Sequence, residues 1–146
     1  MLKDRISHAK HELMFAGTLT ATNDPSGVDL QGFSAATVVC SIGEMTNVGN
    51  TESWTFALEE SDSVASGYTD VAESDMLLEY GNNDGSAASG VFATVDDAAG
   101  DEANYTVGYS GSKRYIRVVA TAANTPGATT IAVSVIKEAL QKPVVG

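Results

Sequence analysis

The feature that most constrains the fold of this chain is a succession of short apolar or alternating segments, separated by residues that favour turns. The clearest alternation places Trp54, Phe56 and Leu58 on one parity, which is expected of a strand that buries one face. Runs of Gly, Asn, Asp, Ser and Pro between the segments supply the turns. The segments expected to form strands are residues 12–22, 33–42, 54–60, 68–71, 91–95, 103–109, 113–122 and 129–137, with 75–80 as a strand or a turn of helix.

Alternation within these segments predicts which side chains face the core. In the first segment Leu13 and Phe15 share one parity with Gly17 and Leu19. Residues 33–42 are apolar on both parities, which is typical of a strand that is covered on both faces or lies in the middle of a sheet.

About eight short strands in a chain of 146 residues predict one all-β domain built as an antiparallel β-sandwich. A jelly roll is the first expectation and an immunoglobulin-like sandwich is the alternative, because the sequence does not order the strands. We expect a basic N-terminal arm at residues 1–11, the sandwich at 12–137 and an extended C-terminal tail at 138–146, which contains Pro143.

Charge is distributed very unevenly along the chain, whose formal net charge is −11. Residues 12–112 contain 17 of the 19 acidic residues and no Lys or Arg. This asymmetry predicts an acidic surface and a second surface of mixed charge, although an acidic composition inherited from a saline habitat is an alternative. Because phosphate contacts need clustered Lys and Arg, nucleic acid is not expected as a partner.

The sequence also bears on the compartment. The first 11 residues lack the apolar stretch of a secretory signal, and no apolar run approaches the roughly 20 residues that span a bilayer. The single cysteine, Cys40, excludes an internal disulfide and is expected to be buried. We therefore expect a soluble protein that is made in the cytoplasm and has no membrane partner.

No residue pattern predicts catalysis, a cofactor or a metal site. His8 and His11 are the only histidines, and their place in the expected arm offers no core partner for a Ser-His-Asp or Cys-His arrangement. Glu59 and Glu60 are adjacent on a strand, so they should point to opposite faces rather than act as a pair. Acidic loops such as 96–102 could hold calcium, but ordinary turn chemistry is expected there. A hydrolase is therefore the least favoured class.

Three stretches together resemble small structural proteins of tailed-bacteriophage virions. They are residues 28–39, residues 58–63 with 67–71, and Tyr109-Ser-Gly-Ser-Lys-Arg-Tyr-Ile-Arg-Val-Val119, and the ending 142–145 is similar too. The third stretch is the most specific. The likeness covers roughly residues 25–145, although the loop at 81–90 is extra relative to the family's compact pattern.

The resemblance implies a decoration or cement protein. Such a protein binds the outside of an assembled capsid and reinforces it without catalysis, commonly as a trimer or another cluster. The expected location is therefore the virion surface, after synthesis in the host cytoplasm, and the expected partners are the major capsid protein and further copies of this chain. The family supplies no catalytic motif to transfer to these residues.

Two groups of residues are candidates for contact with a partner. The basic arm and tail contribute one group, and the outer side of the 113–122 strand contributes the other, whose arginine forms either a local salt bridge or a contact with a neighbouring subunit or capsid. Ile116, Val118 and Ala120 should face the core of that strand. The candidates are Lys3, Arg5, Lys10, Lys137 and Lys142 in the first group and Tyr115, Arg117 and Val119 in the second.

A glycan- or receptor-binding sandwich of a phage tail or cell surface is the alternative function. Such sites use exposed aromatic rings as stacking platforms. Trp54 is expected in the core, and the tyrosines are expected at the edges of the core or at a subunit interface. The candidate aromatic residues are Trp54, Tyr68, Tyr80, Tyr105, Tyr109 and Tyr115.

Overall fold

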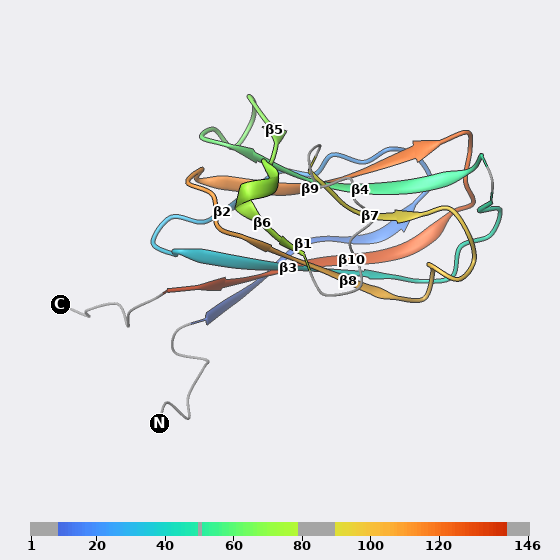
Figure 1. Ribbon diagram of the computed structural model, residues 1–146, viewed down its shortest axis with the longest axis horizontal. Coiled ribbons are helices and arrows are strands. Elements are labelled where there is room, and N and C mark those ends of the chain that lie inside the picture. The colour runs from blue at the N-terminus through green and yellow to red at the C-terminus, as the bar shows by residue number, and fades with distance from the viewer. Residues whose placement is uncertain (1–8, 50, 79–89, 140–146) are drawn as a thin grey trace, which may run out of the picture.

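The computed structural model describes residues 9–49, 51–78 and 90–139. In this part of the chain two antiparallel sheets face each other as a β-sandwich (Figure 1), which confirms the predicted fold class. The strands are β1 (Ala9–Leu19), β2 (Val28–Asp29), β3 (Ala35–Ile42), β4 (Ser53–Ser61), β5 (Thr69–Asp70), β6 (Met76–Leu78), β7 (Val91–Val95), β8 (Asn104–Tyr109), β9 (Tyr115–Ala123) and β10 (Thr129–Glu138). The segment predicted as strand or helical turn contains both, because the 3-10 turn η2 (Glu73–Asp75) leads directly into β6.

The strand order is that of a jelly roll. Sheet A has the order β1-β10-β3-β8-β6, and in sheet B β2, β9 and β4 are followed by β5 and β7 along the other side of β4. Without the short β5 and β6, the remaining strands form two four-stranded layers in the order β1-β10-β3-β8 and β2-β9-β4-β7. This order is the double Greek key of a jelly roll, so the first expectation holds and the immunoglobulin-like alternative is wrong.

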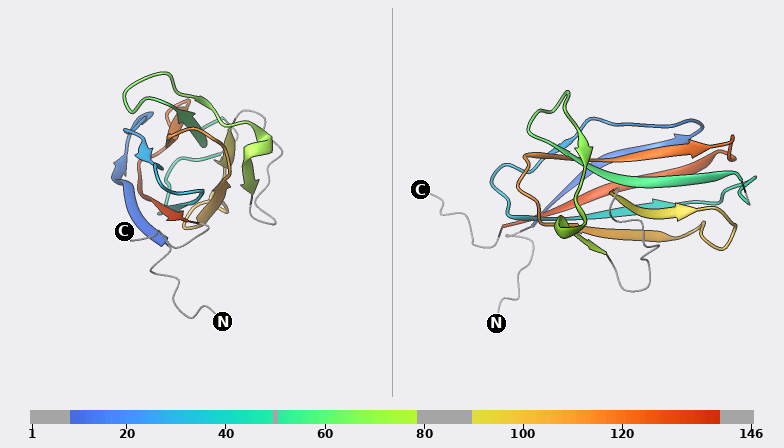
Figure 2. Two further views of the ribbon diagram at one scale, coloured as in Figure 1. Left: turned by 90° about the vertical axis from the view of Figure 1, so that its left-hand side faces the viewer. Right: turned by 45° about the horizontal axis from the view of Figure 1, so that its top comes forward.

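The core lies between the two sheets, which enclose it in the end-on view of Figure 2. Trp54, Phe56 and Leu58 are fully buried on β4, as the alternation predicted. The Trp54 indole N–H donates to the carbonyl of Gly127 at 3.0 Å, so this large ring is buried without an unpaired polar group. Burial of each such side chain stabilises the fold by about 1.5–3 kcal/mol.

β1 departs from simple alternation at a β-bulge. The register with β10 shifts between Leu13 and Phe15, so that Leu13 lies opposite Ser134 and Phe15 lies opposite Val133. Leu13 is therefore 64% exposed on the outer face, and the prediction that it shares the core side of Phe15 is wrong. A bulge inserts one residue and reverses the parity of everything before it.

The two terminal strands reach into the segments predicted as the N-terminal arm and the C-terminal tail. Residues 9–11 belong to β1, and β10 continues to Glu138. Both additions arise from the same ladder, in which Ala9 pairs with Glu138. Among the described residues no helix is long and apolar enough to cross a membrane.

The sandwich has two ends with different composition. We call the first the terminal pole; it comprises the start of β1, the end of β10 and residues 30–34, 62–68 and 110–114 (Figure 1). We call the other the acidic pole; it comprises residues 43–49, 51–52, 96–103 and 124–128, which include no Lys or Arg. Its six acidic residues are Glu44, Glu52, Asp96, Asp97, Asp101 and Glu102.

Candidate partner-binding surfaces

The two strands that begin and end the domain lie side by side in sheet A. Because β1 and β10 are antiparallel neighbours, Lys10 pairs with Lys137 and both lie at the terminal pole. The loop between β8 and β9, which holds Lys113 and Arg114, lies at the same pole. Basic residues that are far apart in the sequence are thus gathered at one end of the molecule.

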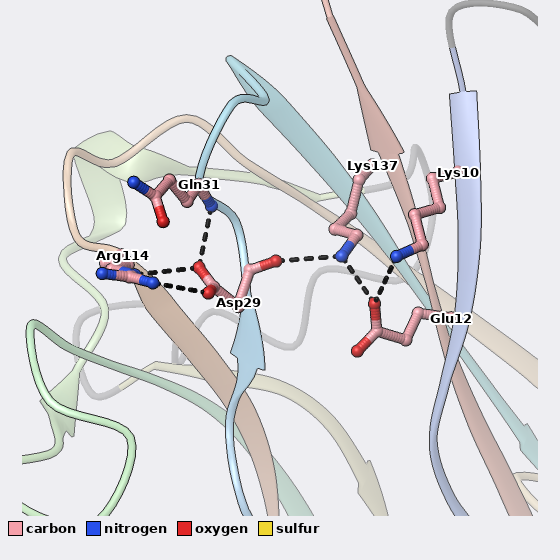
Figure 3. A network of polar contacts seen from close by, with 6 residues as sticks. All are labelled: Lys10, Glu12, Asp29, Gln31, Arg114 and Lys137. Carbon is pink, nitrogen blue, oxygen red and sulfur yellow. Dashed lines mark hydrogen bonds and ion pairs between the residues drawn. The ribbon is translucent and has the colours of Figure 1, made fainter.

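Lys137 is nearly inaccessible, because only 3% of its side chain is exposed. Its Nζ donates hydrogen bonds to Oε2 of Glu12 at 2.5 Å and to the backbone carbonyl of Asp29 at 2.9 Å. The ammonium also lies 5.1 Å from the centre of the Phe33 ring. Figure 3 shows Lys137 between Glu12 on β1 and Asp29 on β2, so this side chain ties the two sheets together.

Asp29 extends the same network to the β8–β9 loop. Its carboxylate accepts from Nε and Nη2 of Arg114 at 3.0 and 2.8 Å, and from the backbone N–H of Gln31 at 2.9 Å (Figure 3). These hydrogen bonds lower the pKa of Asp29 from 3.8 to about 2, and the contact with Arg114 has the largest effect. The same contact raises the pKa of Arg114, and the fork geometry fixes both loops relative to each other.

A second polar cluster lies inside the terminal pole. The hydroxyl of Tyr109 donates to Oε2 of Glu60 at 2.6 Å and accepts from the backbone N–H of Lys113 at 3.0 Å. Burial, followed by the Glu60 contact, raises the pKa of Tyr109. Lys113 in turn donates to Asp62 at 2.6 Å, which lowers the pKa of Asp62 and raises that of Lys113.

Arg117 lies on the outer face of sheet B, directly opposite Glu59 in the ladder. Its Nε donates to Glu59 Oε2 at 2.7 Å, and its guanidinium lies 4.1 Å from the centre of the Tyr68 ring. Only 18% of the Arg117 side chain is exposed. Its Nη1 also lies 3.7 Å from Oδ2 of Asp24. The local salt bridge that the sequence left as one alternative is therefore present.

Tyr115 and Val119 accompany Arg117 on this outer face, because they alternate with buried residues. Ile116, Val118 and Ala120 point into the core, as predicted. The division of β9 into a core face and an outer face is thus confirmed. Whether the outer face meets a partner stays a prediction.

Every described Lys and Arg has an acidic neighbour within the chain, and Lys10 and Lys137 share Glu12. Each of the five has a carboxylate oxygen within 4.0 Å, so the described part of the terminal pole has no free cation. These residues are Lys10, Lys113, Arg114, Arg117 and Lys137. Of the other predicted contact residues, Lys3, Arg5 and Lys142 lie outside the described ranges.

A shallow cavity of about 360 Å³ opens at the terminal pole. It lies between residues 30–35 and the β8–β9 loop, and its lining includes Phe33, Gln31, Ser112 and Tyr109. Its size is near the lower limit for pockets that bind small molecules. It offers an aromatic edge and several hydrogen-bonding groups.

Within the described ranges, which exclude His8, the residues considered for catalysis do not come together. Cys40 is completely buried, and burial raises the pKa of its thiol to about 12, so it is not a thiolate nucleophile. His11 is exposed on β1, on the other side of sheet A from Cys40. Glu59 and Glu60 point in opposite directions, toward Arg117 and Tyr109.

The carboxylates of the acidic pole accept backbone hydrogen bonds, one within a turn and one from a neighbouring loop. Asp97 accepts the N–H of Ala99 at 2.8 Å, and Asp101 accepts the N–H of Met45 at 2.8 Å. In the ranges that the structure describes, no group of three or more His, Cys, Asp or Glu is arranged to hold a metal ion.

Sequence reasoning did not identify Glu12, Asp29 or Tyr68 as the partners of Lys137, Arg114 and Arg117. Each pairing joins segments that are many residues apart and depends on strand register. The sequence offered one signal, for the pair Arg117–Glu59. Alternation places Glu59 on the outer side of β4 and Arg117 on the outer side of β9, so the two could meet if these strands are neighbours. A scan of protein-family models and a search of curated proteins found no match to this chain.

Proposed function

We propose that this chain is a virion structural protein that binds the outer surface of a phage capsid and reinforces it without catalysing a reaction. The major capsid protein and further copies of the chain are its partners in this proposal. The resemblance of residues 109–119 to such proteins motivates the class.

The pairing of Ala9 with Glu138 is the structural observation that supports this proposal most directly. The segments 1–8 and 140–146 adjoin this pair, so Lys3, Arg5 and Lys142 belong to segments that join the sandwich at the same corner. A protein that reinforces a shell gains from several weak contacts made together, because linked contacts raise the effective concentration of each other. In this proposal the capsid contacts this corner, and the acidic pole faces solvent.

Deletion of residues 1–8 tests the proposal without cutting a strand, whereas deletion of 1–11 would also remove the first residues of β1. Purified chain is mixed with capsids assembled from the major capsid protein of the same genome, and the bound fraction is measured by co-sedimentation. The wild type should bind and should raise the temperature at which capsids open. A wild type that neither binds nor stabilises these capsids rules out the proposed function.

A charge-matched pair of variants separates a role of the terminal segments from the total charge. Lys3→Gln with Arg5→Gln removes two charges from the segment that precedes β1, and Asp96→Asn with Glu52→Gln removes two at the acidic pole. The first pair should weaken capsid binding, and the second should leave it close to wild type. Equal binding by both would contradict the role of residues 1–8 while leaving capsid binding itself intact.

The cavity at the terminal pole is the observation that favours the alternative, a glycan- or receptor-binding module. Phe33 is half-buried beside it, and Gln31 and Ser112 add hydrogen-bonding groups. Tyr109 and Tyr68 are less suitable platforms, because Tyr109 is buried and Tyr68 is stacked on Arg117. Binding of the isolated protein to a glycan array, lost in Phe33→Ala, would support this alternative.

A further inference from the structure

The outer face of sheet A is almost free of charge. Strand alternation and the bulge in β1 place eighteen residues on it, and Glu138, at the terminal pole, is the only Lys, Arg, Asp or Glu among them. The residues are Ala9, His11, Leu13, Ala16 and Thr18 on β1, Thr130, Ala132, Ser134, Ile136 and Glu138 on β10, Ala35, Thr37, Val39 and Ser41 on β3, Asn104, Thr106 and Gly108 on β8, and Leu77 on β6.

This face carries apolar side chains among small and hydroxyl residues at its centre, and a leucine at each margin. Val39 lies on the central strand β3, between Ser134 and Thr106 of the neighbouring strands. At the two edges of the sheet, Leu13 on β1 and Leu77 on β6 are 64% and 66% exposed. Surfaces of soluble domains commonly have about a quarter to a third of charged residues, so a whole sheet face with one charge at its end is unusual for an exposed surface.

We propose that this face is a self-association surface on which a second copy of the chain packs face to face. The argument for a second copy is electrostatic. Two chains of net charge −11 repel each other, and burying unpaired charges is costly. On the outer face of sheet A, two acidic copies can meet with Glu138, at the terminal pole, as the only Asp, Glu, Lys or Arg among the eighteen residues. The acidic poles stay at the ends of the sandwich, outside the contact.

The area is sufficient for a specific dimer. Five strands spaced about 4.8 Å apart, over the eight residues of β3 at about 3.3 Å each, give a face of about 600 Å². Two copies would bury on the order of 1,200 Å², the lower limit of stable specific interfaces. Contact of one face with the same face of another copy closes at two copies.

Two other surfaces fit a second copy less well. The outer face of sheet B has the Arg117–Glu59 pair in its ladder, and Tyr68 lies across it. The free edge of β1 is a possible site for strand addition, but Lys10 and Glu12 point inward there and a bulge interrupts the strand. Inward charges and bulges are features that prevent pairing of edge strands.

Sedimentation velocity of the full-length chain, alone and without capsids, tests the inference independently of the proposed function. At about 100 µM the wild type should sediment as a dimer. Raising NaCl from about 50 to about 500 mM should strengthen the dimer, because salt screens the repulsion of acidic chains and the contact itself contains no ion pair.

Thr37→Lys and Thr121→Lys form a matched pair of variants. Each adds one positive charge to the outer face of a sheet, Thr37 in sheet A and Thr121 in sheet B. Both lower the net negative charge, so general repulsion cannot explain a loss of dimer. Thr37→Lys should raise the dissociation constant at least about tenfold, while Thr121→Lys should stay dimeric. Ser134→Lys repeats the test on β10 if Thr37→Lys does not fold.

Three results would overturn the inference. The first is a wild type that is monomeric at about 100 µM and 500 mM NaCl. The second is a dimer that Thr37→Lys leaves intact. The third is a trimer, which would need contacts between two different faces. If the wild type is monomeric and Thr37→Lys abolishes capsid binding, the face belongs to the capsid contact instead.

Discussion

Lys137 on β10 and Glu12 on β1 form an ion pair at 2.5 Å in which the lysine is almost completely buried and the glutamate is partly exposed. The pair joins the first and last strands of the domain, and Lys137 also donates to the backbone carbonyl of Asp29 in the opposite sheet. Loss of either partner should therefore change the stability of the fold by a different amount. A buried ammonium needs its carboxylate, whereas a partly exposed carboxylate can be hydrated.

Glu12→Ala should be more destabilising than Lys137→Met. The first change leaves a buried ammonium with one carbonyl acceptor and should lower the free energy of unfolding by about 2–4 kcal/mol. The second replaces the lysine with an apolar side chain of similar length and should change it by less than about 1.5 kcal/mol. Urea unfolding at neutral pH measures both. The reverse order would show that Lys137 is hydrated in solution.

Asp29 should make the protein acid-sensitive in a narrow window. Its pKa is lowered from 3.8 to about 2 in the folded chain, so its contribution to stability is fully present above about pH 4 and is lost as the pH falls toward 2. Arg114→Gln should bring the pKa of Asp29 part of the way back toward 3.8, since the Gln31 N–H remains. Carboxylate NMR titration measures this change. Asp62, whose pKa depends on Lys113, is the internal control and should not shift.

Tyr109 should make the fold sensitive to alkali. Its pKa is raised above the ordinary value of 10 by burial and by Glu60, so the stability it contributes is present below about pH 10 and is lost as the pH rises further. Tyrosinate absorbance near 295 nm should therefore develop later in the folded chain than in urea. Tyr109→Phe should remove part of this delay, and Tyr68 and Tyr105, whose pKa values are also raised, should retain the remainder.

Arg117→Ala should destabilise the fold by about 1–2 kcal/mol, because it removes the Glu59 pair and the contact with Tyr68. A double-mutant cycle with Glu59→Ala isolates the ion pair, and a coupling free energy near zero would contradict its role. The hypothesis that this face also meets a partner makes a separate prediction. Capsid co-sedimentation of Arg117→Ala should then fall by more than the loss of folded protein explains.

The chain by itself specified much of the fold. Alternation located the core side of β4 and β9, since Trp54 and Ile116 each follow the two-residue period of a strand. The apolar character of residues 33–42 on both parities indicated a strand in the middle of a sheet, and β3 is the central strand of sheet A. Turn residues marked the ends of most strands, because their backbone preferences are local.

Tertiary structure alone decided strand order, register and the partners of the charges. The exposure of Leu13 follows from one bulge, and the burial of Lys137 follows from the pairing of β1 with β10. The sequence showed that basic residues occupy the two terminal segments, but not that each described Lys and Arg lies within 4.0 Å of a carboxylate oxygen. Periodicity is a local property of the backbone, whereas ion pairs and sheet faces depend on which distant strands become neighbours.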